Sequence, residues 1–145
     1  MRNAPCAEVL LTRGGSEVLL IRRAHEPFQG CWALPGGFVE YGEHPADAAR
    51  RELLEEVGVP ARLTSVLGVY NDPRFDDIAA VMTFVGEADG RPLQLDAKEV
   101  LEAKWLSAAE ARAVTPMAPG VDDRLRDWTR LATGAIPLAL GLDLE

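Results

Sequence analysis

The segment Pro45–Val57 constrains the fold most, because it is the clearest helix in a chain that otherwise alternates between short apolar runs and turns. Pro45 suits the first helical turn, where its missing N–H is no loss, and Gly58 supplies a C-terminal stop. The apolar residues between them recur at helical spacing and form one stripe, Ala46, Ala49, Leu53 and Val57. The sequence therefore predicts a helix that buries one face.

Apolar runs on both sides of this helix predict strands. Residues 7–12 and 17–22 are joined by a turn that contains Gly14 and Gly15, and a Gly-Gly pair between two such runs indicates a hairpin because glycine accepts a positive φ. A loop is expected at 24–31. The other expected elements are two short extended pieces around Pro35-Gly36-Gly37, strands at 62–70, 78–87 and 104–106, and a polar loop at 71–77.

Two further helices are predicted toward the C-terminus. Ser107 with Glu110 three residues later is a capping-box pattern, and a last helix is expected over 121–131 with Leu125, Trp128 and Leu131 facing inward. The apolar tail 135–144 is expected to be a packed arm. The length of 145 residues corresponds to one domain. The order strands, helix, strands, helices predicts a mixed α+β fold in a single layered domain, 1–145.

Charge and cysteine content restrict the partners and the compartment. The formal net charge is −8, which argues against non-specific nucleic-acid binding, since that binding needs a Lys/Arg footprint. Two cysteines, Cys6 and Cys31, cannot make a disulfide framework. No signal-peptide pattern is present, and no window is long and apolar enough for a membrane span. We therefore expect a cytoplasmic protein with free thiols and with neither a nucleic-acid nor a membrane partner.

Three carboxylates lie on one face of the predicted helix. Glu52, Glu55 and Glu56 are spaced i, i+3, i+4, and like charges at these spacings destabilise a helix by about 0.2–0.5 kcal/mol per pair. Arg51 offsets part of that repulsion. A hard divalent cation would make the cluster favourable, since Mg²⁺ takes oxygen ligands and commonly bridges carboxylates to substrate phosphates. The alternative is an ordinary solvated acidic face.

The segment around these carboxylates follows a longer pattern. In Gly37–Val59, Gly37 is followed after five residues by Glu43 and after seven more by Arg51-Glu52, then by an aliphatic residue, Glu55-Glu56, Gly58 and Val59. This segment resembles the Nudix box, and the chain resembles the Nudix hydrolase family over about residues 5–133. The resemblance implies an α/β/α sandwich with a mixed sheet. It also implies Mg²⁺- or Mn²⁺-dependent cleavage of a pyrophosphate linkage.

The resemblance assigns roles to individual residues. Glu52, Glu55 and Glu56 are the expected metal-binding and catalytic carboxylates, and the backbone of Gly36 and Gly37 is expected to approach the metal. Glycine suits such an approach because it has no side chain to block it. Arg51 is expected to hold the carboxylate of Glu55, four residues on. The expected chemistry is neutralisation of phosphate charge by the metal, followed by removal of a proton from water by a carboxylate.

Members of the family often use one more glutamate from outside the box. The candidates here are Glu87, Glu99 and Glu102, and Glu99 is preferred as a catalytic residue because it precedes the strand at 104–106. Each of the three is alternatively a solvated surface residue.

Four residues are candidates for contacts with the substrate. Arg22 and Arg23 end a strand that should reach the site and would contact phosphate, whereas Tyr70 and Phe75 would stack on a base. The alternatives are surface arginines and buried aromatic packing. A thiol–imidazole pair of Cys31 with a histidine is poorly supported, and the sequence has no Cys/His spacing for zinc.

The expected partner is a small-molecule nucleotide, and a homodimer remains open. The preferred substrate is ADP-ribose or a related dinucleotide, because residues 27–39 and the loop with Pro73 resemble those of ADP-ribose pyrophosphatases. Asp76 and Asp77 depart from that loop pattern and would repel extra phosphates. A nucleoside triphosphate of the 8-oxo-dGTP kind is the alternative substrate. A non-catalytic nucleotide-sensing Nudix domain is the alternative function, although such domains usually have a degraded box.

Overall fold

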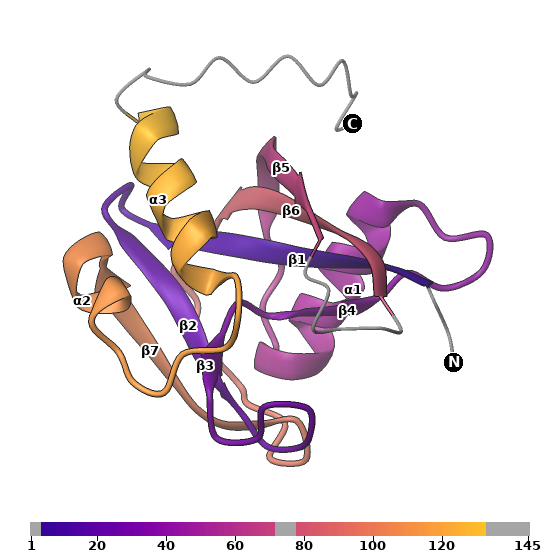
Figure 1. Cartoon of the computed structure of the whole chain (residues 1–145), viewed down its shortest axis with the longest axis horizontal. Helices are drawn as coiled ribbons and strands as arrows, with labels where there is room; N and C mark the ends of the chain where they lie inside the picture. The colour runs from indigo at the N-terminus through magenta and orange to yellow at the C-terminus, as the bar shows by residue number, and fades with distance from the viewer. Residues whose placement is uncertain (1–3, 72–77, 133–145) are drawn as a thin grey trace.

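A mixed sheet flanked by helices forms the protein in the computed structural model, which describes residues 4–71 and 78–132 (Figure 1). The central strand order is β3-β2-β1-β6-β5, with β4 paired to β1 and β7 paired to β2. The strands are β1 (Ala4–Arg13), β2 (Glu17–Arg23), β3 (Trp32–Ala33), β4 (Gly36–Phe38), β5 (Arg62–Tyr70), β6 (Ile78–Glu87) and β7 (Val100–Ser107). The helices are α1 (Pro45–Val57), α2 (Ala108–Arg112) and α3 (Val121–Ala132).

The predicted hairpin between β1 and β2 is confirmed. Arg13 pairs with Glu17 across the turn, and Gly14 and Gly15 adopt φ values of 61° and 75°. These left-handed conformations are easily reached only by glycine among the common residues. The hairpin sets β2 antiparallel to β1, while β6 runs parallel to β1 on its other side. The sheet is therefore mixed, as expected.

Helix α1 has the bounds that the sequence predicts. Its four stripe residues are each at most 1% exposed, and Gly58 ends the helix with a left-handed φ of 72°. His44 caps the first turn, because its Nδ1 accepts a 3.0 Å hydrogen bond from the backbone N–H of Ala46. That capping role was not anticipated from the sequence.

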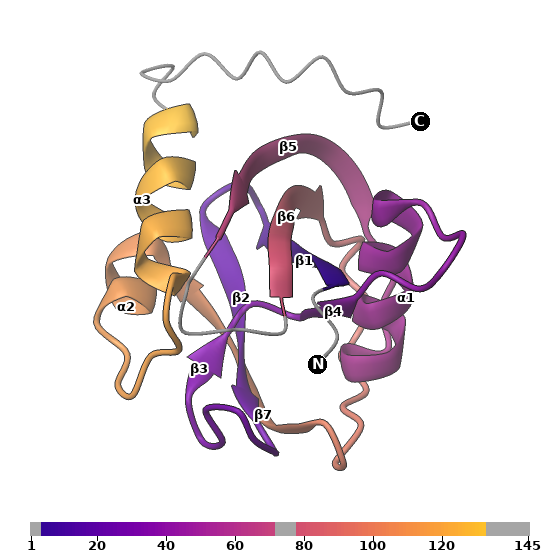
Figure 2. The ribbon, with the colours of Figure 1, turned by 45° about the vertical axis from the view of Figure 1, so that its right-hand side comes forward.

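Two apolar cores lie on opposite faces of the sheet. Helix α1 covers one face, while α2 and α3 cover the other (Figure 2). The Ser107–Glu110 capping box is present, and Leu125 and Trp128 on α3 are buried. This layering confirms the expected α/β/α sandwich.

Strand β7 is longer than predicted, because it covers Val100–Ser107 rather than only 104–106. Its pairing with β2 extends from Glu17↔Ser107 to Arg23↔Val100. Pairing with β2 thus extends the strand over residues 100–103, where the polar residues do not show the apolar alternation by which a strand is predicted.

Some expectations lie outside the described residues. These are the structure of the loop at 72–77, including Pro73, Phe75, Asp76 and Asp77, and the packed arm at 135–144. Within residues 4–71 and 78–132, no helix is long and apolar enough to cross a membrane.

Candidate active site

An acidic cavity of about 410 Å³ opens beside α1, between β4 and the loops that follow β2 and precede β7. That volume lies within the range of small-molecule sites. Glutamates from separate parts of the chain line it together with the backbone of β4. The carboxylate-bearing lining residues are Glu26, Glu40, Glu52, Glu55, Glu56 and Glu99, and the glycines are Gly36 and Gly37.

Glu56 is the most buried of these carboxylates, at 7% exposure. Its Oε1 accepts a 2.8 Å hydrogen bond from the backbone N–H of Gly36. Burial, with the neighbouring charge of Glu52 as the next cause, raises the pKa of Glu56 to about 9. A carboxyl group in this state is costly to ionise unless positive charge is brought next to it.

Glu52 lies directly against the glycine pair. A side chain at Gly37 would place its Cβ 2.5 Å from the carboxylate of Glu52, so that carboxylate would have to move from its present position. A Cβ at Gly36 would lie 2.5 Å from the backbone oxygen of Ala7. Burial raises the pKa of Glu52 as well. Gly37 therefore allows the close approach of Glu52 to β4, and Gly36 allows the close approach of β4 to β1.

Arg51 links three glutamates to β4. It donates to Glu43 through Nε at 2.8 Å and through Nη2 at 3.0 Å. Its Nη1 donates to Glu52 at 3.0 Å and to Glu55 at 3.2 Å, and its Nη2 also donates to the backbone oxygen of Phe38. The hydrogen bonds from Arg51 lower the pKa of Glu43 to about 2. Arg51 thus reaches Glu55, as the spacing predicts, and orients Glu52 in addition.

Glu99 enters the cavity from the loop before β7, where His25 holds it. The Nε2 of His25 lies 2.8 Å from Glu99 Oε2, and its Nδ1 lies 2.9 Å from the backbone oxygen of Glu26. Both contacts raise the pKa of His25, that to Glu26 being the larger cause. Sequence reasoning missed this role of His25, because nothing in its local pattern points to Glu99, which is 74 positions away.

The two other glutamates considered outside the box lie elsewhere. Glu87 pairs with Arg62 at 2.6 Å. The two residues line a separate pocket, where β5 begins and β6 ends. Glu102 lies on β7 at 3.8 Å from Arg22 and 3.9 Å from Lys104. Neither lines the acidic cavity.

The arginines at the end of β2 are separated by the structure. Arg23 lines the acidic cavity and donates through Nε to the backbone oxygen of Pro27 at 2.7 Å. Arg22 donates to the backbone oxygen of Gly30 instead and does not line the acidic cavity. Tyr70 packs under Arg124, whose guanidinium carbon lies 4.2 Å from the ring centroid, and donates to Asp127 at 2.8 Å. Phe75 is outside the described residues.

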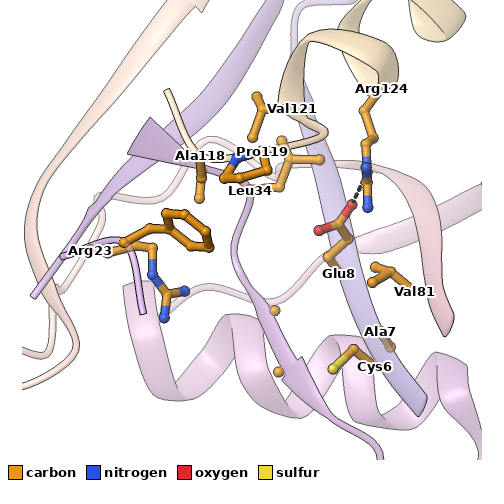
Figure 3. Close-up of a pocket in the computed structure, with 14 residues that line it drawn as sticks. Cys6, Ala7, Glu8, Arg23, Leu34, Val81, Ala118, Pro119, Val121 and Arg124 are labelled. Carbon is orange, nitrogen blue, oxygen red and sulfur yellow. Dashed lines mark hydrogen bonds and ion pairs between the residues drawn. The ribbon is translucent and has the colours of Figure 1, made fainter. Parts of the chain in front are cut away.

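A second, more apolar cavity adjoins the acidic one. The two cavities share four lining residues, Cys6, Arg23, Gly36 and Gly37. Figure 3 shows Arg23 at one end of the second cavity and the ion pair of Glu8 with Arg124 at the other, with Leu34 and Pro119 between them. Sequence reasoning missed Glu8 and Arg124, since neither belongs to a motif.

The acidic cavity has the donor set of a hard divalent cation. Within the part of the chain that the structure describes, no three His, Cys, Asp or Glu side chains already converge on one point; Glu52 and Glu55 are turned toward Arg51, and Glu56 toward Gly36. All the candidate ligands are nevertheless carboxylate oxygens, which Mg²⁺ and Mn²⁺ prefer. The raised pKa of Glu56 and Glu52 marks a place where positive charge would be favourable. The residues therefore fit such an ion.

Comparisons with known proteins agree with this arrangement. A family model described as "NUDIX domain" matches residues 2–129. The ADP-ribose pyrophosphatase of Methanocaldococcus jannaschii is 47% identical over 70 residues, which are 48% of this chain and 41% of that protein. A putative 8-oxo-dGTP diphosphatase of Bacillus subtilis is 38% identical over 101 residues, which are 70% of this chain and 64% of that protein. The chain thus spans about two fifths and two thirds of the lengths of these relatives.

Solved structures show the same fold. A NUDIX hydrolase from Nitrosomonas europaea superposes with a TM-score of 0.79 at 24% identity, covering 92% of this chain and 74% of that one. The NUDIX domain of Shewanella oneidensis NrtR, solved with ADP ribose, gives a TM-score of 0.77 at 21% identity, covering 90% and 89%. With a family model that covers most of its length and a fold shared with these structures, the chain belongs to the Nudix hydrolase family.

Proposed function

We propose that this protein hydrolyses the pyrophosphate linkage of a nucleoside diphosphate joined to another group, with ADP-ribose or a related dinucleotide as its substrate. The main support is that the two cavities adjoin each other and share Arg23, Gly36 and Gly37 in their walls. A substrate of this class has a planar apolar base at one end and charged phosphates farther along. The paired cavities offer a matching apolar space and an acidic, cation-binding space.

The proposed metal ion, Mg²⁺ or Mn²⁺, would be held by Glu52, Glu55 and Glu56, beside the Gly36–Gly37 backbone. When bound, such an ion supplies positive charge that neutralises the phosphates and makes water more acidic. Arg51 fixes the orientation of the Glu52 and Glu55 side chains on α1 by donating hydrogen bonds of 3.0 and 3.2 Å to their carboxylates. The Gly36 N–H holds the Glu56 carboxylate at 2.8 Å.

Two further side chains of the acidic cavity are assigned to phosphate binding and to removal of a proton from water. Arg23 stands at the junction of the two cavities, where its guanidinium can bind a phosphate oxygen. Glu99 is the proposed base outside the Nudix box, because His25 fixes its Oε2 and so orients the carboxylate that would take a proton from water. Arg22 and Tyr70 are not assigned substrate contacts, since their side chains are engaged elsewhere.

ADP-ribose is preferred over a triphosphate for reasons of sequence similarity. The M. jannaschii relative, named as an ADP-ribose pyrophosphatase, has the higher identity, although over a shorter segment. The B. subtilis relative, named as a putative 8-oxo-dGTP diphosphatase, matches over a longer segment and supports the triphosphate alternative. A nucleotide-sensing role without cleavage is less favoured because every specified position of the Nudix box is retained in Gly37–Val59.

A product assay separates these functions. The purified protein is incubated with Mg²⁺ and, separately, with ADP-ribose, other dinucleotides, dGTP and 8-oxo-dGTP. AMP and ribose 5-phosphate from ADP-ribose support the proposal, whereas a nucleoside monophosphate plus pyrophosphate from 8-oxo-dGTP alone would replace it with the triphosphate activity. Binding without any turnover would favour the sensing role.

A further inference from the structure

The polar end of the apolar cavity is built from two residues that are 116 positions apart in the chain. Arg124 on α3 donates through Nε to Glu8 Oε2 on β1 at 2.8 Å. Thr83 on β6 donates to the same oxygen at 2.6 Å. The Arg124 side chain is 8% exposed and the Glu8 side chain 17%. This pair is therefore a largely buried charged group at the wall of a cavity that is otherwise mainly apolar.

The pair is held rigidly. Arg124 also donates through Nη1 to the backbone oxygen of Gly120 at 2.9 Å, and its guanidinium lies over the ring of Tyr70. These contacts use Nε and Nη1 and fix the plane of the guanidinium, so that the direction of Nη2 is fixed as well. In Figure 3 the second carboxylate oxygen of Glu8 points away from Arg124, toward the side of the cavity where Leu34 lies. Groups preorganised in this way favour specific recognition.

The wall of the cavity thus offers a hydrogen-bond acceptor, the Glu8 carboxylate, next to a cationic donor, the Arg124 guanidinium. Arginine alone would favour guanine, whose N7 and O6 both accept hydrogen bonds, whereas adenine offers an N7 acceptor next to an N6 amino donor. With a ring nitrogen on Arg124, guanine or hypoxanthine would place its 6-oxo oxygen against the Glu8 carboxylate. Adenine would place an N–H there instead. The walls contributed by Leu34, Val81 and Val121 suit a flat, apolar ring.

We infer that Glu8 and Arg124 are specificity-determining residues that read the edge of an adenine base, with Glu8 Oε1 accepting from the 6-amino group and Arg124 donating to the neighbouring ring nitrogen. The inference rests on the proposed function, in that the ligand is a nucleotide. It adds the two residues that distinguish adenine from other bases. It also places the base at the Glu8 end of the apolar cavity and the phosphates at the Arg23 end.

The inference is tested by binding rather than by turnover. Calorimetric titration in Mg²⁺ compares AMP with IMP, which differs at the 6-position, and with N6,N6-dimethyl-AMP, which has no amino N–H. The wild-type protein should bind AMP about tenfold or more tightly than either analogue, the difference expected for one hydrogen bond to a charged acceptor. Equal affinity for AMP and IMP, or no measurable AMP binding, would overturn the inference.

Two variants complete the test. Glu8→Gln keeps the shape of the side chain, but its amide can turn to present either an acceptor or a donor, so the preference for AMP over IMP should fall to within about twofold. Glu17→Gln, which changes an exposed carboxylate paired with Arg13 on β2, should keep the full preference. An unchanged preference in a folded Glu8→Gln protein would contradict the inference. If that variant does not fold, the affinities of the wild-type protein for AMP and for the dimethyl analogue still decide between the two outcomes.

The outcome is separable from that of the proposed function. A Glu8-dependent preference for AMP with no hydrolysis of any nucleotide would support the base assignment and reject the activity. Hydrolysis of ADP-ribose and of its hypoxanthine analogue at equal kcat/KM would support the activity and reject the base assignment.

Discussion

The carboxylate of Glu56 and the backbone N–H of Gly36 are joined by a 2.8 Å hydrogen bond between helix α1 and strand β4. This bond ties the acidic helix face to the glycine pair, and it holds in a buried position a carboxyl group whose pKa is raised to about 9. In the absence of a metal ion, the Glu56 carboxyl group therefore does not readily ionise. This affects both the stability and the activity of the protein, and both can be measured.

The first prediction concerns the pH dependence of stability without metal. Between the ordinary pKa of 4.5 and the folded value of about 9, the folded protein holds a proton on Glu56 that the unfolded chain has lost. The free energy of unfolding should therefore fall as pH rises through this window, by up to about 1.4 kcal/mol per pH unit from this one group. Urea unfolding in EDTA at pH 6 and pH 8.5 measures the fall.

The matched variant is Glu56→Gln, which cannot ionise. Its free energy of unfolding should decline less between the same two pH values, and at pH 8.5 it should be at least as stable as the wild-type protein. Parallel declines in the two proteins would show that Glu56 is not the titrating group.

The second prediction concerns the close approach of Gly37 to Glu52. A Gly37→Ala substitution places a Cβ 2.5 Å from the Glu52 carboxylate, so Glu52 must move away from β4. We expect hydrolysis to fall by about 10² or more, as for the loss of a positioned catalytic group. Gly86→Ala on β6, where the nearest atoms would lie at 3.2–3.3 Å and away from both cavities, is the control. Comparable activity in the two folded variants would remove the geometric role of Gly37.

The third prediction concerns metal binding itself. Mn²⁺ or Mg²⁺ at millimolar concentration should raise the melting temperature, because a ligand that binds only the folded state stabilises it. The shift should shrink in Glu52→Gln and remain in Glu17→Gln, whose carboxylate lies outside the cavity. A melting curve that ignores Mn²⁺, or equal shifts in both variants, would speak against a metal site on α1.

Local sequence patterns predicted the helices and most strands well. The bounds of α1 follow from Pro45, the apolar stripe and Gly58, because local stereochemistry and one buried face decide them. The hairpin at Gly14-Gly15 follows from the same kind of local reasoning. The length of β7 does not, since pairing with β2 rather than its own periodicity extends it.

Contacts between distant residues could not be predicted from local patterns. The sequence places Arg22 and Arg23 side by side at the end of a strand, where neighbouring side chains point to opposite faces. Which of the two faces borders the cavity depends on how distant elements pack around the strand, and it is Arg23 that lines the cavity, together with Ile21. The ion pairs of His25 with Glu99 and of Glu8 with Arg124 depend on how the whole sheet is assembled. Their partners share no spacing that a periodicity argument could detect.

Metal-dependent hydrolysis is tested by measuring the release of AMP from ADP-ribose by the wild-type protein and by Glu56→Gln, with melting curves to show that both are folded. We expect that wild-type turnover needs Mg²⁺ or Mn²⁺, yields AMP and ribose 5-phosphate in equal amounts, and falls by about 10² or more in the variant. Turnover in EDTA, or near-wild-type activity in a folded Glu56→Gln protein, would contradict this expectation.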